Sequence, residues 1–313
     1  MKILITGGAG FIGSGLAERL IQDENNFVVI VDNLLTGHAK KIPPSPLGNL
    51  KFIKTDVNNR TELSEIMTTY QFDYVFHFAA VVGVQRTLNH PVSVLNDLKG
   101  FENILDLCKN TGVKRIYFSS SSEVYGEPVE LPQNEETTPL NSRLPYAIVK
   151  NAGEAFLKSY QYEYGLEYTI FRFFNTYGPK QSRNFVISKF IFAALNNQDI
   201  TIYGDGNQTR TFCYIDDNID ACVKTFENNL FVNDVLNIGN DQEIKIKDLA
   251  ELIINVTGSK SKIKYLPPLK EGDMPRRLPD LSKMHEVINK KQISLEQGIK
   301  KILKEGLFEF KYQ

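Results

Sequence analysis

The fold is decided at the N-terminus by residues 2–13, KILITGGAGFIG. An apolar run typical of a buried strand leads straight into Gly7, Gly10 and Gly13, and apolar residues at helical spacing come after them. Glycines at these places let a backbone turn tightly, approach a pyrophosphate and pack a new helix against a sheet. The spacing is G-x-x-G-x-x-G, so a plain turn is the alternative, and the choice between them depends on the surrounding sequence.

Short apolar runs alternate with helical patterns through the first half of the chain. We expect strands at residues 2–6, 27–32, 51–55, 73–78, 114–118 and 167–173, which are rich in Val, Ile, Phe and Tyr. We expect helices at residues 11–22, 61–70, 92–110 and 146–164. This alternation predicts an α/β fold, a Rossmann-type doubly wound parallel sheet.

The rhythm changes after about residue 173. Helices are expected at residues 185–197, 217–228, 246–257 and 295–305, and short strands at 200–203 and near 211–215. We therefore predict a Rossmann domain over residues 1–173 and a smaller C-terminal α+β substrate domain over residues 174–313, with interleaved boundaries.

Composition excludes several classes of partner and site. The 313 residues include 36 Lys and Arg against 37 Asp and Glu, a balance that favours neither nucleic acid nor an anionic membrane. The three cysteines are widely spaced and predict neither a disulfide framework nor a metal site. A signal-peptide layout and an apolar run of about 20 residues are both missing from the sequence, so we expect a cytoplasmic protein.

Carboxylates come directly after the second and third predicted strands. Asp32 lies about 20 residues beyond the glycines, where a carboxylate meets the adenosine ribose of a dinucleotide. Its charge repels a 2′-phosphate and no Arg lies closely after it, so NAD is favoured over NADP. The alternative is a turn or helix-capping role before Asn33. Asp56 and Val57, after the third strand, are candidates for the adenine end of the same site.

Tyr146 and Lys150 lie four residues apart at the start of a predicted helix, so their side chains share one face. A phenol has a pKa of about 10, and a nearby ammonium stabilises the phenolate. We therefore expect Lys150 to draw Tyr146 toward a base that works near neutral pH. A surface pair on a helix is the alternative for these two residues taken alone.

The chain resembles the extended short-chain dehydrogenase/reductases of the NAD-dependent nucleotide-sugar epimerase/dehydratase group. The resemblance rests on motifs that occur in family order over nearly the whole chain: Thr6 to Ser14, Asp32-Asn33-Leu34, Asp56-Val57, His77-Phe78-Ala79-Ala80, Asn96, Phe118 to Gly126, Pro145-Tyr146 with Lys150, Phe174 to Pro179, and Arg277-Leu278-Pro279-Asp280. It implies an enzyme that oxidises a nucleotide-diphosphate sugar with NAD, GDP and UDP being the expected nucleotides.

The resemblance also implies roles for individual residues. Tyr146 removes a proton from a sugar hydroxyl, usually at C4, Lys150 supports it and binds the nicotinamide ribose, and Ser121 holds the reacting hydroxyl. The implied cofactor-binding residues are Gly7, Gly10, Phe11, Ile12, Gly13, Asp32, Asn33, Asp56, Val57, Phe78, Ala79, Ala80, Asn96, Ser119, Tyr146 and Lys150. His77 either belongs with this strand end or is a packed strand histidine.

The substrate end of the implied site carries cations and amides. The implied residues are Ser121, Ser122, Asn175, Asn184, Arg210 and Arg277, since guanidinium groups suit phosphate geometry. An isolated arginine is more often a solvated surface charge, and here the family context favours binding. The resemblance further implies a homodimer through residues 92–110 and 146–164.

Glu123 bears on the fate of the sugar once C4 is oxidised. The 4-keto sugar is either released or carried on to C4 epimerisation, whereas a carboxylate at this position also suits a 4,6-dehydratase or a UDP-glucuronate decarboxylase. Many dehydratases keep an Asp where this chain has Ser122, which weakens dehydration. The structural alternative is that Glu123 hydrogen-bonds its own turn. A non-catalytic NAD-binding regulator is a remote alternative, because the tyrosine and lysine are both retained.

Overall fold

A computed structural model describes residues 1–83, 87, 89–268 and 275–307. The chain divides into two compact units whose segments interleave in the sequence. The first unit comprises Met1–Val124, Ser142–Phe173 and Ile219–Leu236, and the second Tyr125–Asn141, Phe174–Asn218 and Asn237–Gln313. Among the described residues, no helix is both long enough and apolar enough to cross a membrane.

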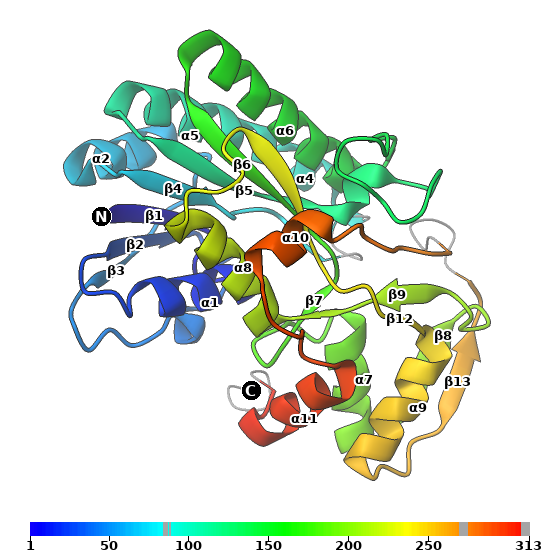
Figure 1. The fold of residues 1–313 in the computed structure, drawn as a ribbon. Coiled ribbons are helices and arrows are strands. Elements are labelled where there is room, and N and C mark those ends of the chain that lie inside the picture. The colour runs from blue at the N-terminus through cyan, green and yellow to red at the C-terminus, as the bar shows by residue number, and fades with distance from the viewer. Residues whose placement is uncertain (84–86, 88, 269–274, 308–313) are drawn as a thin grey trace. The chain divides into compact units, whose positions relative to one another are not determined.

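The first unit is built on a seven-stranded parallel sheet (Figure 1). Its strands are β1 (Lys2–Thr6), β2 (Phe27–Asp32), β3 (Leu50–Lys54), β4 (Tyr74–His77), β5 (Arg115–Ser121), β6 (Glu167–Phe173) and β11 (Asp234–Ile238). Their spatial order is β11-β6-β5-β4-β1-β2-β3, so the chain reverses its winding direction between β1 and β4. In doubly wound sheets, ligands bind at the carboxyl ends of the strands at this reversal.

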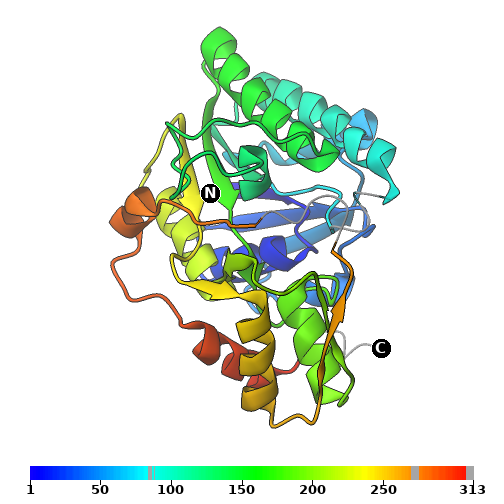
Figure 2. The same ribbon diagram turned by 90° about the vertical axis from the view of Figure 1, so that its right-hand side faces the viewer.

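Helices cover both faces of this sheet (Figures 1 and 2). One face is covered by α2 (Arg60–Tyr70), α4 (Pro91–Leu95), α5 (Asp97–Thr111) and α6 (Pro145–Tyr164), and the other by α1 (Phe11–Leu20) and α8 (Ile215–Glu227). Alternate strand residues serve the two faces: Leu4 and Phe118 belong to the core under α5 and α6, whereas Tyr117 packs on Phe226 of α8. Both faces of the sheet are therefore covered and shielded from solvent, as is usual for a parallel sheet.

The predicted α/β class and doubly wound sheet are confirmed. The helix expected at residues 92–110 is divided at Asn96, and the strand expected near 211–215 is two short strands. Strand β11 was not predicted. Its pattern is broken by Asn237, which is buried because its side chain accepts from Tyr125 Oη at 2.7 Å and donates to the Gln133 carbonyl at 2.9 Å.

Small paired strands and helices make up the second unit. The pairs are β7 (Thr176–Tyr177) with β10 (Cys213–Tyr214), β9 (Thr209–Thr211) with β12 (Glu243–Lys245), and β8 (Ile200–Tyr203) with β13 (Ile263–Leu266). The helices are α7 (Val186–Leu195), α9 (Ile246–Thr257), α10 (Ser282–Val287) and α11 (Leu295–Glu305), together with the first residues of α8. Neither β13 nor α10 was expected from the proline-punctuated sequence.

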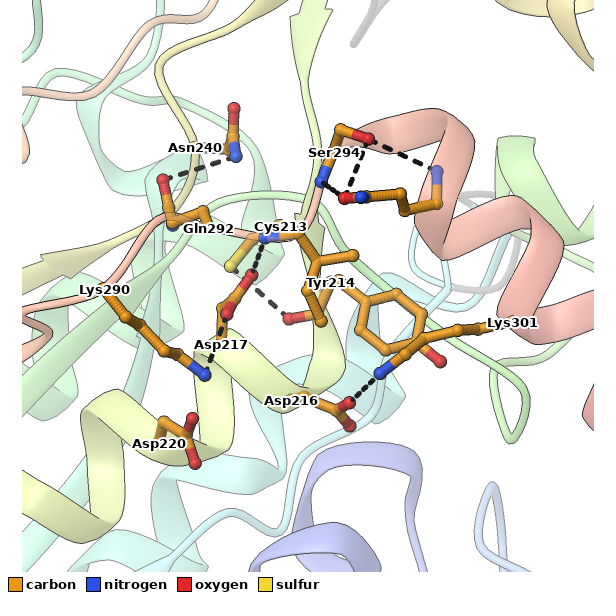
Figure 3. Close-up of polar contacts among 12 residues, drawn as sticks. Cys213, Tyr214, Asp216, Asp217, Asp220, Asn240, Lys290, Gln292, Ser294 and Lys301 are labelled. Carbon is orange, nitrogen blue, oxygen red and sulfur yellow. Dashed lines mark hydrogen bonds and ion pairs between the residues drawn. The ribbon is translucent and has the colours of Figure 1, made fainter.

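Two carboxylates at the start of α8, of which one is buried, hold the C-terminal part of this unit (Figure 3). Asp217 has no exposed surface, accepts the backbone N–H of Ile293 at 2.8 Å and lies 3.3 Å from Lys290 Nζ. Lys301 of α11 pairs with Asp216 at 2.8 Å. The segment leading into α11 is thereby held in place.

Candidate active site

The glycine-rich loop between β1 and α1 leaves no room for side chains. A Cβ atom on Gly7 would lie 2.6 Å from Ala79 N, and one on Gly13 would lie 2.5 Å from Gly7 O. Gly7 also has φ +69°, a left-handed conformation that favours glycine. Helix α1 then begins at Phe11 with Gly10 as its N-cap and no side-chain cap. A tight glycine cradle under an uncapped helix N-terminus fits a dinucleotide pyrophosphate.

Asp32, at the end of β2, is tied to that loop. Its Oδ2 accepts from Ala9 N at 3.0 Å and its Oδ1 accepts from Leu34 N at 2.8 Å, and the side chain is buried. Burial raises the pKa of Asp32, although both hydrogen bonds oppose that rise. A Cβ on Gly37 would lie within 2.8 Å of both carboxylate oxygens, so the backbone at Gly37 packs against Asp32 and leaves no room for a side chain.

The other predicted adenosine residues lie at neighbouring strand ends. Asn33 donates to Asp56 Oδ2 at 3.0 Å, which links the segments after β2 and β3. The Val57 carbonyl accepts from Asn103 of α5 at 3.0 Å. Phe11 and Ile12 are half-buried in the first turn of α1.

The end of β4 is fixed by Thr6 of β1. The Thr6 hydroxyl accepts from the backbone N–H groups of Phe78 and Ala79 at 3.1 and 3.2 Å, and it hydrogen-bonds His77 Nδ1 at 2.9 Å. Burial lowers the pKa of His77 to about 3, so this histidine is neutral and packed. Phe78, Ala79 and Ala80 are half-buried.

Asn96 and its neighbour Asp97 have different surroundings. Asn96 ends α4 and is exposed. Asp97 accepts the backbone N–H of Val81 at 2.7 Å, and its charge acts on Lys150. The residue that lies beside the predicted lysine is therefore Asp97, which the sequence motif did not single out.

One face of α6 meets the carboxyl end of β5. Tyr146 hydrogen-bonds the Ser121 side chain. One helical turn further, Lys150 donates from Nζ to the Ser119 carbonyl at 2.6 Å, and it lies 5.8 Å from the centre of the Tyr146 ring. The structure thus brings together Ser119, Ser121, Tyr146 and Lys150.

Burial dominates the protonation of this group. It raises the pKa of the Tyr146 phenol, the charge of Glu123 raises it further, and the hydrogen bond with Ser121 opposes the rise. Burial also lowers the pKa of Lys150 to about 8. Burial is the largest influence on the Tyr146 pKa and raises it, so the lowering of that pKa by Lys150 stays a prediction.

Ser122 and Glu123 begin the 3₁₀ turn Ser122–Tyr125 that comes after β5. Ser122 is buried, and the backbone N–H of Glu123 donates to Ser121 Oγ at 3.2 Å. The Glu123 carboxylate is close enough for its charge to act on Tyr146. Glu123 therefore stands beside the tyrosine, whatever bonds its carboxylate makes within the turn.

The second unit brings three of its four predicted residues onto adjoining segments. Asn175 Nδ2 donates to the Thr211 carbonyl at 3.0 Å, next to Arg210 of β9. The backbone N–H of Thr209 donates to Pro275 O at 3.0 Å, which joins this strand to the segment that carries Arg277. Arg277 is buried.

Arg276 and Asn184 make contacts of other kinds. Arg276, beside Arg277, makes a two-pronged ion pair with Glu243 of β12, with contacts of 2.5 to 3.1 Å. Asn184 is exposed in the turn before α7, where its backbone N–H donates to Ser182 Oγ at 3.3 Å. This bond is local to the turn and does not join Asn184 to the arginine segments.

Comparison with known proteins gives a family. Residues 3–239 match the model of the NAD dependent epimerase/dehydratase family. The chain belongs to this family.

Relatives of this epimerase/dehydratase chain span its whole length. It is 37% identical over 308 residues to a putative UDP-glucose 4-epimerase of Methanocaldococcus jannaschii, covering 96% of this chain and 97% of the relative. It is 36% identical over 317 residues to the UDP-N-acetyl-alpha-D-glucosaminuronate decarboxylase of Bacillus cytotoxicus, covering 96% of each. The solved UDP-glucose 4-epimerase of Thermotoga maritima superposes with a TM-score of 0.92 at 31% identity, covering both chains completely.

NAD is the cofactor of this epimerase/dehydratase, and the glycine cradle fits it. Sequence motifs identified the residues around that cradle. They did not identify Asp97, Glu154 or Arg172, whose contacts join distant parts of the chain. The detectable signal for Glu154 was its position one further turn along the face of Tyr146 and Lys150.

Asp32→Asn tests the dinucleotide preference. We expect NAD to bind about tenfold more weakly, because the ribose hydroxyls lose a charged acceptor, and NADP to gain relative to NAD because the repulsion of its 2′-phosphate is removed. Calorimetric titration with both dinucleotides measures this. Asp73→Asn, at the start of β4, is the control, and an unchanged ratio of NAD to NADP affinity in Asp32→Asn would refute the assignment.

Proposed function

We propose that the enzyme oxidises C4 of a UDP sugar, with Tyr146 as the proton acceptor. The observation that carries the proposal is the meeting of α6 with β5, where the Tyr146 phenol bonds Ser121 and Lys150 lies one turn away. Ser121 is in reach of a hydroxyl held by Tyr146, and Lys150 supplies a cation beside the phenol ring.

Three residues act together in removing the proton of the C4 hydroxyl. Tyr146 Oη takes the proton from the C4 hydroxyl while Ser121 holds the same oxygen, so that the C–O bond becomes C=O. The Lys150 ammonium offsets the cost of a buried phenolate. The glycine cradle and Asp32 would hold NAD, which when bound would supply the acceptor for the hydride from C4.

We propose UDP and not GDP as the nucleotide because the relatives are named for UDP sugars. The chain is more than 30% identical to proteins named for UDP sugars, among them the solved UDP-N-acetylglucosamine 4-epimerase of Methanobrevibacter ruminantium, at 34% identity and a TM-score of 0.87 over 97% of this chain and 99% of that one. We assign the diphosphate to Asn175, Arg210 and Arg277, because guanidinium groups bind phosphate oxygens in pairs.

Epimerisation at C4 is the net reaction that we favour. It needs no residue beyond those that oxidise C4. The hydride removed from C4 would be returned to the opposite face of the same carbon. Release of the keto sugar is the other outcome of the same chemistry, and it needs an outside acceptor to restore NAD.

Decarboxylation of a UDP-uronic acid is the second candidate, and Glu123 favours it. This carboxylate lies close enough to Tyr146 to raise its pKa. A C4 ketone makes loss of the C5 carboxyl group as CO2 possible, and we assign Glu123, as the charged residue whose field acts on Tyr146, to that end of the sugar. Elimination of the C6 hydroxyl lacks the usual acid, since Ser122 occupies its position.

The homodimer and the cytoplasmic location stay predictions. Helix α6 offers an exposed strip for a second copy, since Ile148 is 45% and Tyr162 87% exposed. We expect the NAD-binding and nucleotide-sugar-binding roles to belong to the first and second units respectively.

Tyr146→Phe tests the oxidation step. Loss of the phenolic oxygen removes the proton acceptor, so we expect kcat to fall at least about a hundredfold while NAD affinity stays within about twofold. Tyr162→Phe, on the exposed side of the same helix, is the matched control with full activity. Turnover retained by Tyr146→Phe would rule out this mechanism.

Glu123→Gln separates the two net reactions. The wild type is incubated with NAD and UDP-glucose, UDP-galactose, UDP-N-acetylglucosamine or UDP-glucuronate, with GDP-mannose and dTDP-glucose as further arms, and products are measured by NMR. An epimerase interconverts C4 epimers and keeps most of its activity in Glu123→Gln. A decarboxylase releases CO2 from UDP-glucuronate and loses at least about tenfold. Turnover of only the GDP sugar would refute the UDP assignment.

A further inference from the structure

Helix α6 carries a third polar residue on the face of Tyr146 and Lys150. Glu154 lies four residues beyond Lys150, and its side chain is 1% exposed. Ser120, the middle residue of the β5 serine run, donates to Glu154 Oε1 at 2.5 Å. Three successive serines of β5 therefore meet three successive turns of α6.

Arg172 of β6 holds the same carboxylate from the next strand. It is paired in register with Ser120 and is 2% exposed. Its Nε donates to Glu154 Oε1 at 3.0 Å and its Nη2 to Oε2 at 2.7 Å, a two-pronged contact. Such a contact fixes the carboxylate in both position and orientation.

A fully buried ion pair is costly to keep for stability alone. Desolvation of both ions cancels much of their attraction, and an apolar pair of similar size often stabilises as well. The same two strands carry another arginine pair at their opposite ends, Arg115 with Glu167, in which Glu167 is 45% exposed. Of the two ion pairs described for these strands, the Glu154–Arg172 pair at the carboxyl ends is the one in which both side chains are buried.

We infer that the Glu154–Arg172 pair is a positioning element for Lys150, which holds β5 against α6 and keeps the lysine protonated for the C4 oxidation. This inference rests on the proposed function for its link to turnover. Glu154 and Arg172 do not touch the reacting atoms, and they act through Ser120 and through the charge beside Lys150.

The charges around Lys150 give the inference its pH dependence. The groups that face it are Asp97 from α5, neutral His77 from β4, and Tyr146 and Glu154 from its own helix, with Arg172 behind Glu154. Burial lowers the pKa of Lys150 to about 8, and Asp97 and Glu154 raise it. Loss of the Glu154 charge therefore deprotonates Lys150 at lower pH. Activity that needs the ammonium falls as pH rises through that value.

Glu154→Gln tests the inference in the ligand-free chain. We expect the ¹³Cε resonance of Lys150, assigned by its absence from Lys150→Met, to titrate about 1 pH unit lower than in the wild type. With the substrate that the wild type turns over, we expect the alkaline limb of kcat to move by the same amount and kcat at pH 8 to fall about fivefold. Glu167→Gln, at the other end of the strands, is the matched control and should leave both measurements unchanged.

A double variant protects the test from loss of folding. Glu154→Gln leaves Arg172 as a buried unpaired cation, so Glu154→Gln with Arg172→Met removes both charges, and we expect Lys150 to titrate below its wild-type value there as well. An unchanged Lys150 titration in whichever variant folds would overturn the inference. The NMR titration needs no turnover, so a wild type inactive on every UDP sugar would refute the proposed function and leave this result standing.

Discussion

The contact between the carboxyl end of β5 and one face of α6 is the constraint on which the rest of the site depends. Ser119 and Ser121 supply the oxygens that Lys150 and Tyr146 reach, and both serines are buried. Helix α6 packs closely on both of its neighbours, since a Cβ on Gly153 would lie 2.4 Å from Phe101 Cζ of α5 and 3.0 Å from Phe118 Cζ of β5. With so little slack, small displacements of α6 would separate the phenol from the serine.

The cofactor cradle depends on a second close approach, between β1 and β4. Gly7 faces the Ala79 backbone, and the Thr6 hydroxyl holds the two N–H groups that begin the segment after β4. Asp97 then ties Val81 to the start of α5. The reversal of the sheet between β1 and β4, the glycine loop and the Lys150 environment are therefore linked through short polar contacts.

Local patterns in the sequence were sufficient for the first six strands of the sheet and for the glycine loop. Each of these features depends on residues that are close together in the chain. Strand β11 could not be predicted because Asn237 breaks its apolar pattern. Asn237 is buried there because it hydrogen-bonds Tyr125 and Gln133, which are distant in the sequence. The expected effect of Lys150 on the Tyr146 pKa came from their spacing in the sequence, whereas the burial that raises this pKa depends on the folded unit. Glu154 meets Ser120 across 34 residues of chain, a contact that no local pattern reveals.

The central claim is that hydrogen leaves C4 as hydride while Tyr146 takes the hydroxyl proton. The most direct measurement uses the UDP sugar that the enzyme turns over fastest, with deuterium at C4. We predict slower turnover than with the unlabelled sugar, and deuterium found either on the nicotinamide or back at C4 of the product. Equal rates, with the C4 label exchanged into solvent water, would contradict this claim.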